Sequence, residues 1–147
     1  MAYRPATPQD LAAIIREAAA RGETLAVSGT GSRPGIGPGP ADAALDLTGL
    51  GGHIDHDPGE LRLTLPASTP LLHVEQLLAK AGQCLAFEPP SPDAIWGLGH
   101  GTIGGAVASG LSGPRRPFAG ATRDHVLGLS GVTGRAEIFT AGGKVLK

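Results

Sequence analysis

The N-terminal third of the chain combines one helical hydrophobic pattern with two strand-like patterns. Residues 7–22 repeat apolar side chains at helical spacing, begin with Thr7 before Pro8 and end at a glycine, which predicts an amphipathic helix. Residues 24–28 form a short apolar run typical of a buried strand, and residues 43–50 alternate apolar and polar positions. We therefore expect a strand, a glycine-rich loop and a second strand after the helix.

The middle of the chain predicts a hairpin followed by a second helix. Residues 53–68 alternate on either side of a Pro-Gly turn, with Leu61 among the leucines of the buried face. Residues 69–82 repeat the helical pattern, with Thr69 as the N-cap and a proline at the first helical position.

The C-terminal part is rich in glycine and proline, and its elements are shorter. Residues 84–90 predict a strand in which Cys84 is a buried, inert thiol, and residues 91–101 predict a loop. Residues 102–113 begin like a helix, and residues 124–147 predict two strands joined by a turn.

Together these elements predict an α+β fold in a single domain over residues 1–147. A small βαβ-like lobe would occupy about residues 1–50. A second lobe, over about residues 51–147, would hold a mixed or antiparallel sheet with helices. A ligand cleft would lie between the two lobes.

Composition and charge exclude several classes of partner. The chain of 147 residues has 12 Lys and Arg against 13 Asp and Glu, so no overall charge draws it to nucleic acid or an anionic membrane. No apolar run approaches the roughly 20 residues of a membrane span, and the N-terminus lacks a signal-peptide layout. We therefore expect a cytoplasmic protein.

The first glycine-rich stretch, residues 26–40, departs from the common phosphate-binding motifs. Gly29, Gly31 and Gly35 are spaced G-x-G-x-x-x-G, and the prolines that follow prevent the helix that a Rossmann fold places there. A P-loop also needs Gly-Lys-Ser/Thr, which is absent from this stretch. Two interpretations remain: a backbone nest that wraps a phosphate with nearby hydroxyl groups, or an ordinary surface loop.

A second glycine-rich stretch lies at residues 102–113. Gly104 and Gly105 would fall in the first turn of a short helix, where unpaired backbone N–H groups favour an anion. The alternative is a helix of small residues packed closely against a strand. Two such segments in one small domain strengthen the hypothesis of a phosphate-bearing ligand.

Other candidate chemistry is sparse. His53 and His56 alternate with carboxylates and could hold a metal, although a solvent-facing hairpin explains them as well. His100 precedes the second glycine segment and could contact a ligand or stabilise its loop. The sequence offers no nucleophilic triad, paired-carboxylate site or catalytic acid or base.

Several segments, in order and spacing, resemble the FAD-binding domain of the vanillyl-alcohol oxidase (PCMH) type. They include "LAVSGTGS", "LDLTGL", "LAFEPP" and "SGLSGPRRPFAGATRDHVLG", and the resemblance covers nearly all of residues 4–147. Within that type the chain is most similar to the small FAD-binding subunits of bacterial glycolate oxidases. Relative to this family, we expect the domain to be incomplete at its C-terminus.

The resemblance implies a set of cofactor-binding residues and no catalytic or metal-binding ones. The first segment would embrace the FAD pyrophosphate through Ser28, Gly29, Thr30, Gly31 and Ser32. The second would line the flavin and ribityl side through Thr102, Ile103, Gly104, Gly105, Ser109 and Gly110. Residues 29–35 contain no histidine, so the FAD would be held noncovalently.

The resemblance also implies partners. The chain would belong to an FAD-dependent glycolate (2-hydroxy-acid) oxidase, with a catalytic FAD subunit and an iron-sulfur subunit. The complex would be cytoplasmic or peripheral at the inner membrane. A sheet edge left exposed would allow a homodimer. The alternative is a noncatalytic structural subunit that keeps the fold but binds no flavin.

Overall fold

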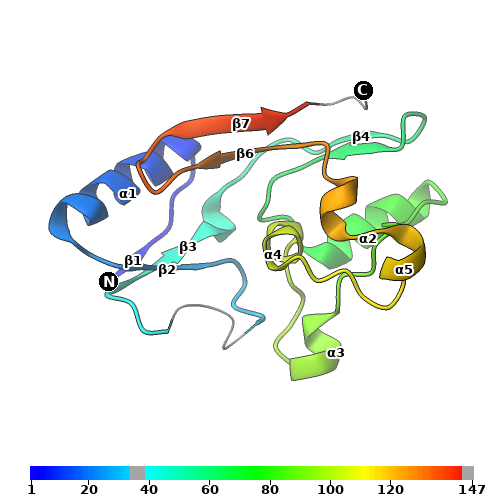
Figure 1. The fold of residues 1–147 in the computed structure, drawn as a ribbon, viewed down its shortest axis with the longest axis horizontal. Helices are drawn as coiled ribbons and strands as arrows, with labels where there is room; N and C mark the ends of the chain where they lie inside the picture. Colours follow the sequence, from blue (N-terminus) through cyan, green and yellow to red (C-terminus); the bar gives the residue numbers. More distant parts are fainter. Residues whose placement is uncertain (34–38, 144–147) are drawn as a thin grey trace.

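The computed structural model describes residues 1–33 and 39–143 and shows a mixed α and β fold with small sheets (Figure 1). A parallel sheet has the order β1-β3-β2, formed by β1 (Ala2–Tyr3), β3 (Ala43–Asp46) and β2 (Leu25–Ser28). Helix α1 (Pro8–Arg21) connects β1 to β2, so the predicted helix and both strands are present. Residues 34–38, including Gly35 of the glycine motif, lie outside the described residues.

The bounds of α1 follow from hydrogen bonds within its own ends. The Thr7 hydroxyl accepts from the Asp10 amide at 3.1 Å, and the Asp10 carboxylate accepts from the Thr7 amide at 2.9 Å. This is a capping box, and it satisfies donors that a helix start leaves unpaired. Gly22 ends the helix with φ +65°, in the left-handed region that glycine adopts at little cost.

Hydrogen bonds beside the β2–β3 pair join the two ends of the first glycine-rich stretch. The Asp42 carboxylate accepts from the Thr24 amide at 2.8 Å and from the Thr24 hydroxyl at 2.6 Å. The expectation that residues 24–28 are buried is wrong, because β2 is an edge strand and Val27 is 64% exposed. Strand β3 is shorter than predicted, because a 3-10 helix begins at Leu47.

The predicted hairpin is confirmed, with β4 (Asp55–Asp57) antiparallel to β5 (Arg62–Thr64). Leu61, however, lies in the turn with φ +52° and is 81% exposed. The strand alternation therefore starts one residue later than the leucine pattern suggested.

Helix α2 (Leu71–Lys80) begins one residue later than the sequence suggested. Its N-cap is Pro70, which has no side chain able to cap the helix, so the prediction of Thr69 as the cap is wrong. Thr69 is buried instead, and its carbonyl accepts from the Ile103 amide at 2.9 Å. Val74 is among the α2 residues that form the core of this half.

Residues 84–90 form no strand. Phe87 is buried, but Cys84 is exposed, so the prediction of a buried thiol is wrong. Part of the stretch expected as a loop is helix α3 (Pro92–Trp96), because Ser91 caps its N-terminus.

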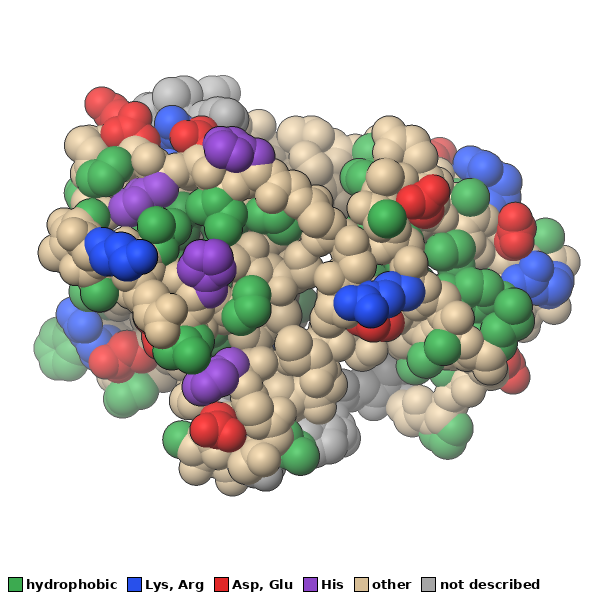
Figure 2. Space-filling model, turned by 180° about the vertical axis from the view of Figure 1, so that it is seen from behind, with side chains coloured by type: hydrophobic (Ala, Val, Ile, Leu, Met, Phe, Trp, Pro, Cys, Tyr) green, Lys and Arg blue, Asp and Glu red, His purple; other side chains and the backbone are tan. Residues whose placement is uncertain are grey.

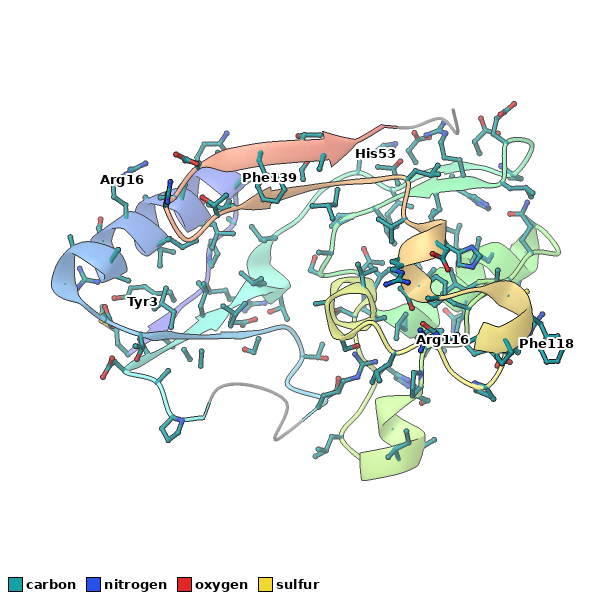
Figure 3. The ribbon with its side chains drawn as sticks, in the orientation of Figure 1. Tyr3, Arg16, His53, Arg116, Phe118 and Phe139 are labelled. Carbon is teal, nitrogen blue, oxygen red and sulfur yellow. The ribbon has the colours of Figure 1, made fainter. Side chains whose placement is uncertain are left out.

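The remaining helices are short. Helix α4 (Ile103–Ser109) confirms the predicted second glycine helix, and α5 (Arg116–Ala119) and a 3-10 helix (Thr122–His125) follow it. Phe118 of α5 is 93% exposed, and Figure 3 shows its ring pointing away from the body of the protein.

The C-terminal strand pair is confirmed as β6 (Gly128–Val132) and β7 (Ile138–Gly142), which are antiparallel. Both strands contact α1, so the end of the described chain packs on its first helix (Figure 1). No helix among the described residues is both long and apolar enough to cross a membrane.

Candidate cofactor site

The two glycine segments lie next to each other in the fold. A Cβ atom placed on Gly29 would lie 3.2 Å from the Thr102 hydroxyl oxygen, so Gly29 follows β2 with its backbone against the start of α4. The Thr30 hydroxyl donates to the His100 carbonyl at 3.0 Å. The fold therefore brings the two predicted halves into one site.

Three consecutive backbone N–H groups of the first segment have no partner in the part of the chain that the structure describes. The amides of Thr30, Gly31 and Ser32 donate to no other residue that the structure describes. Gly31 has φ +67°, a conformation that favours glycine, and the Ser32 side chain is buried. Consecutive N–H groups without partners are suited to bind an anion.

The second segment uses its donors within the protein. The Ile103 amide donates to the Thr69 carbonyl at 2.9 Å, and the Gly104 amide donates to the Ala67 carbonyl at 2.9 Å. The Gly105 amide donates to the Thr102 hydroxyl at 3.1 Å, as at an N-cap. The expectation of unpaired donors at the start of this helix is therefore wrong.

Close packing explains the glycine at position 104. A Cβ atom there would lie 2.7 Å from both the Cβ and the carbonyl oxygen of Ala67. Ala106, two residues on, is fully buried. The structure thus favours the packing interpretation of this helix, with the turn at residues 66–69 as the surface it contacts.

The end of α4 completes the second half of the site. Ser109 is the last helical residue, and its hydroxyl donates to the Ala106 carbonyl at 3.1 Å. Gly110 ends the helix with φ +62°. Ser28, at the end of β2, lies opposite Asp46 in the parallel sheet and leads directly into the first segment.

Arg33 joins the two segments, although no motif in the sequence points to it. Its Nη1 donates to the Gly105 carbonyl at 2.7 Å and to the Ser109 hydroxyl at 2.9 Å. Its Nη2 reaches the Pro90 carbonyl at 3.5 Å. The available signal was a lone cation directly after the glycine and hydroxyl residues of the first segment.

The charge of Arg33 has no counterion within the described residues. No carboxylate of that part of the chain forms a salt bridge with it, and its Nε atom is buried without a hydrogen-bond partner. Burial lowers the pKa of the guanidinium below its usual value. The free amides and this cation together fit a group that carries phosphate.

The histidines do not form a second site. His56 Nε2 lies 2.9 Å from the Gln83 side-chain oxygen, and His53 is exposed. The described residues contain no group of three or more side chains that could hold a metal ion, and the histidines visible in Figure 2 lie apart. The side chain of His100 is exposed and borders a shallow hollow that Glu75 and Ser91 also line.

Comparison with known proteins assigns the family. Residues 1–142 match the FAD binding domain family, and the chain belongs to it. This confirms the resemblance to FAD-binding domains of the vanillyl-alcohol oxidase type.

A curated relative is the glycolate oxidase subunit GlcE of Escherichia coli (strain K12). It is 39% identical over 125 residues, which are 84% of this chain and 34% of that protein. The chain therefore spans about a third of the length of this relative.

Solved structures confirm the fold. The 6-hydroxy-D-nicotine oxidase from Arthrobacter nicotinovorans has a TM-score of 0.77 at 21% identity, over 96% of this chain and 29% of that one. Glucooligosaccharide oxidase from Acremonium strictum has a TM-score of 0.71 at 19% identity, over 96% and 28%. At these identities the likeness shows the fold alone.

Proposed function

We propose that this chain binds FAD noncovalently as the FAD-binding part of a glycolate (2-hydroxy-acid) oxidase subunit. Membership of the FAD binding domain family and the identity to GlcE support the proposal. The observation that carries it is the run of amides at Thr30, Gly31 and Ser32 that have no partner among the described residues, followed in the chain by Arg33, whose side chain reaches α4.

The two segments would make different contacts with the cofactor. Amides of residues 29–32 would bind the diphosphate, and the hydroxyls of Ser28 and Ser32 would add donors. Residues of the second segment would line the site through their small side chains, since their own amides are already paired. FAD, when bound, accepts the electrons, and the chain supplies binding and orientation.

Noncovalent binding is supported by the residues of the first segment. Residues 29–35 contain neither histidine nor cysteine, and the single cysteine of the chain, Cys84, lies between α2 and α3. By contrast, the glucooligosaccharide oxidase of similar fold is described as carrying a 6-S-cysteinyl, 8α-N1-histidyl FAD.

The partners we propose come from the family resemblance, and the relative's being one subunit of a glycolate oxidase supports them. As a part of a glycolate oxidase subunit, the chain would assemble with a catalytic FAD subunit and an iron-sulfur subunit. The complex would be cytoplasmic or peripheral at the inner membrane.

An absorbance spectrum tests the central claim. The purified chain is incubated with FAD and desalted, and the visible flavin band is measured. We expect the wild type to retain the band and Gly31→Val to lose it, because valine is strained at φ +67°. Gly51→Val is the matched control, since Gly51 lies in open space without positive φ.

A second candidate function is a structural subunit that binds no flavin. The pairing of the α4 amides within the chain favours this alternative. Among the described residues, only the first segment then has backbone donors available to a cofactor. A folded wild-type protein that stays colourless after incubation with FAD would support this alternative and contradict the proposal.

A further inference from the structure

Arg33 differs from the other half-buried arginine that forms side-chain contacts in this structure. Arg62 has a side chain 19% exposed, and its charge is balanced by Asp55 at 2.8 Å and Asp57 at 3.7 Å. Arg33 contacts only the neutral oxygen atoms of Gly105, Ser109 and Pro90 within the described residues. A partly desolvated charge without a counterion costs free energy, which an anionic ligand would recover.

The location of Arg33 makes its side chain the source of positive charge between the two segments. Arg33 directly follows the three residues whose amides have no partner among the described residues, and its Nη1 is fixed against α4 on the opposite side. The amides at the start of α4 are all used, so they add no free donor to the site. The positive charge between the two segments therefore comes from a side chain.

We propose that Arg33 is the residue that neutralises the diphosphate of the bound cofactor, an inference that rests on the proposed function. Three hydrogen bonds hold the guanidinium plane in place before the ligand arrives, so little side-chain entropy is lost on binding. The Pro90 carbonyl takes one of the two Nη2 hydrogens, which leaves the other as a donor toward an anion. Arginine suits this role because its planar fork contacts neutral acceptors and an anion at the same time.

The test measures the dissociation constant of FAD by quenching of flavin fluorescence at low and high salt. The variants are Arg33→Met, which removes the charge at similar length, and Arg33→Lys, which keeps the charge without the fork. Arg16→Met is the matched control, because Arg16 is exposed on α1 and lies away from α4 (Figure 3). Circular dichroism establishes that each variant folds.

We expect Arg33→Met to weaken FAD binding by about ten- to hundredfold, as for the loss of a charge-assisted hydrogen bond. The salt dependence seen in the wild type should largely disappear with the charge. Arg33→Lys should keep the salt dependence with weaker binding, and Arg16→Met should match the wild type.

Four results would overturn the inference, and the last of them is distinguishable from the others because it also removes the proposed function. Unchanged FAD affinity in Arg33→Met, or weaker affinity with wild-type salt dependence, would reduce Arg33 to a structural link. If Arg33→Met does not fold, the wild type alone is measured. FAD binding by the wild type that does not depend on salt would likewise show that Arg33 has only a structural role. A wild type that binds no FAD removes the proposed function itself.

Discussion

Glycines in the site are needed for different physical reasons at different positions. Gly31 has a backbone conformation that L-residues rarely adopt, whereas no described residue lies within 4 Å of where its Cβ atom would be. Gly104 has an ordinary helical conformation, but Ala67 leaves no room for a Cβ atom. Conformation decides the first position and packing decides the second.

This difference predicts the effect of a single methyl group. Gly104→Ala should destabilise the protein by roughly 1–3 kcal/mol through overpacking, although alanine favours helix more than glycine does. Gly51→Ala, in open space, is the matched control and should change the free energy of unfolding little. Urea denaturation of both variants measures this, and a Gly104→Ala protein as stable as the wild type would contradict the packing argument.

At the scale of the element, α1 depends on a local exchange of hydrogen bonds at its start. The Thr7 hydrogen bonds lower the pKa of Asp10 below its usual value of 3.8. The folded state thus favours the charged carboxylate. This contribution to stability is complete above pH 3.8 and is lost as the pH falls through the lowered pKa.

Asp10→Asn should therefore be less stable than the wild type at neutral pH, because asparagine carries no charge to favour the helix N-terminus. The difference in free energy of unfolding between the two proteins should shrink as the pH falls below 3.8. Denaturant unfolding across this pH range measures it. A difference that is the same at every pH would show that the charge of Asp10 has no part in capping.

At the scale of the whole molecule, the candidate site depends on parts of the chain that are distant in sequence. The first segment follows β2, and the second is held by the turn at residues 66–69 and by Arg33. The β6–β7 hairpin in turn packs on α1. A ligand bound between the segments should therefore stabilise the fold as a unit.

FAD should raise the thermal unfolding midpoint, and more so at higher concentration. Binding to the folded state alone stabilises by about 2.7 kcal/mol at a ligand concentration 100 times the dissociation constant. Differential scanning fluorimetry with a dye read outside the flavin band, or circular dichroism, measures the shift. Riboflavin, which lacks the diphosphate, should shift the midpoint less, and equal shifts would argue against a diphosphate-binding first segment.

The sequence by itself determined the features whose causes are local. Helix α1 was predicted with its cap and its end because Thr7, Asp10 and Gly22 act within a few residues of the helix ends. The β4–β5 and β6–β7 hairpins and both glycine segments were also visible, since turn residues and alternation are local signals. The family resemblance followed from these segments in order.

Only the tertiary structure decided features that depend on long-range contacts. Thr69 is a residue type that favours an N-cap, but its carbonyl instead accepts from the Ile103 amide and so links α2 to α4. The α4 amides looked free in sequence and are paired, because the turn containing Ala67 supplies an acceptor. Arg33 gains its role from Gly105, 72 residues away, and no local pattern encodes a contact across that separation.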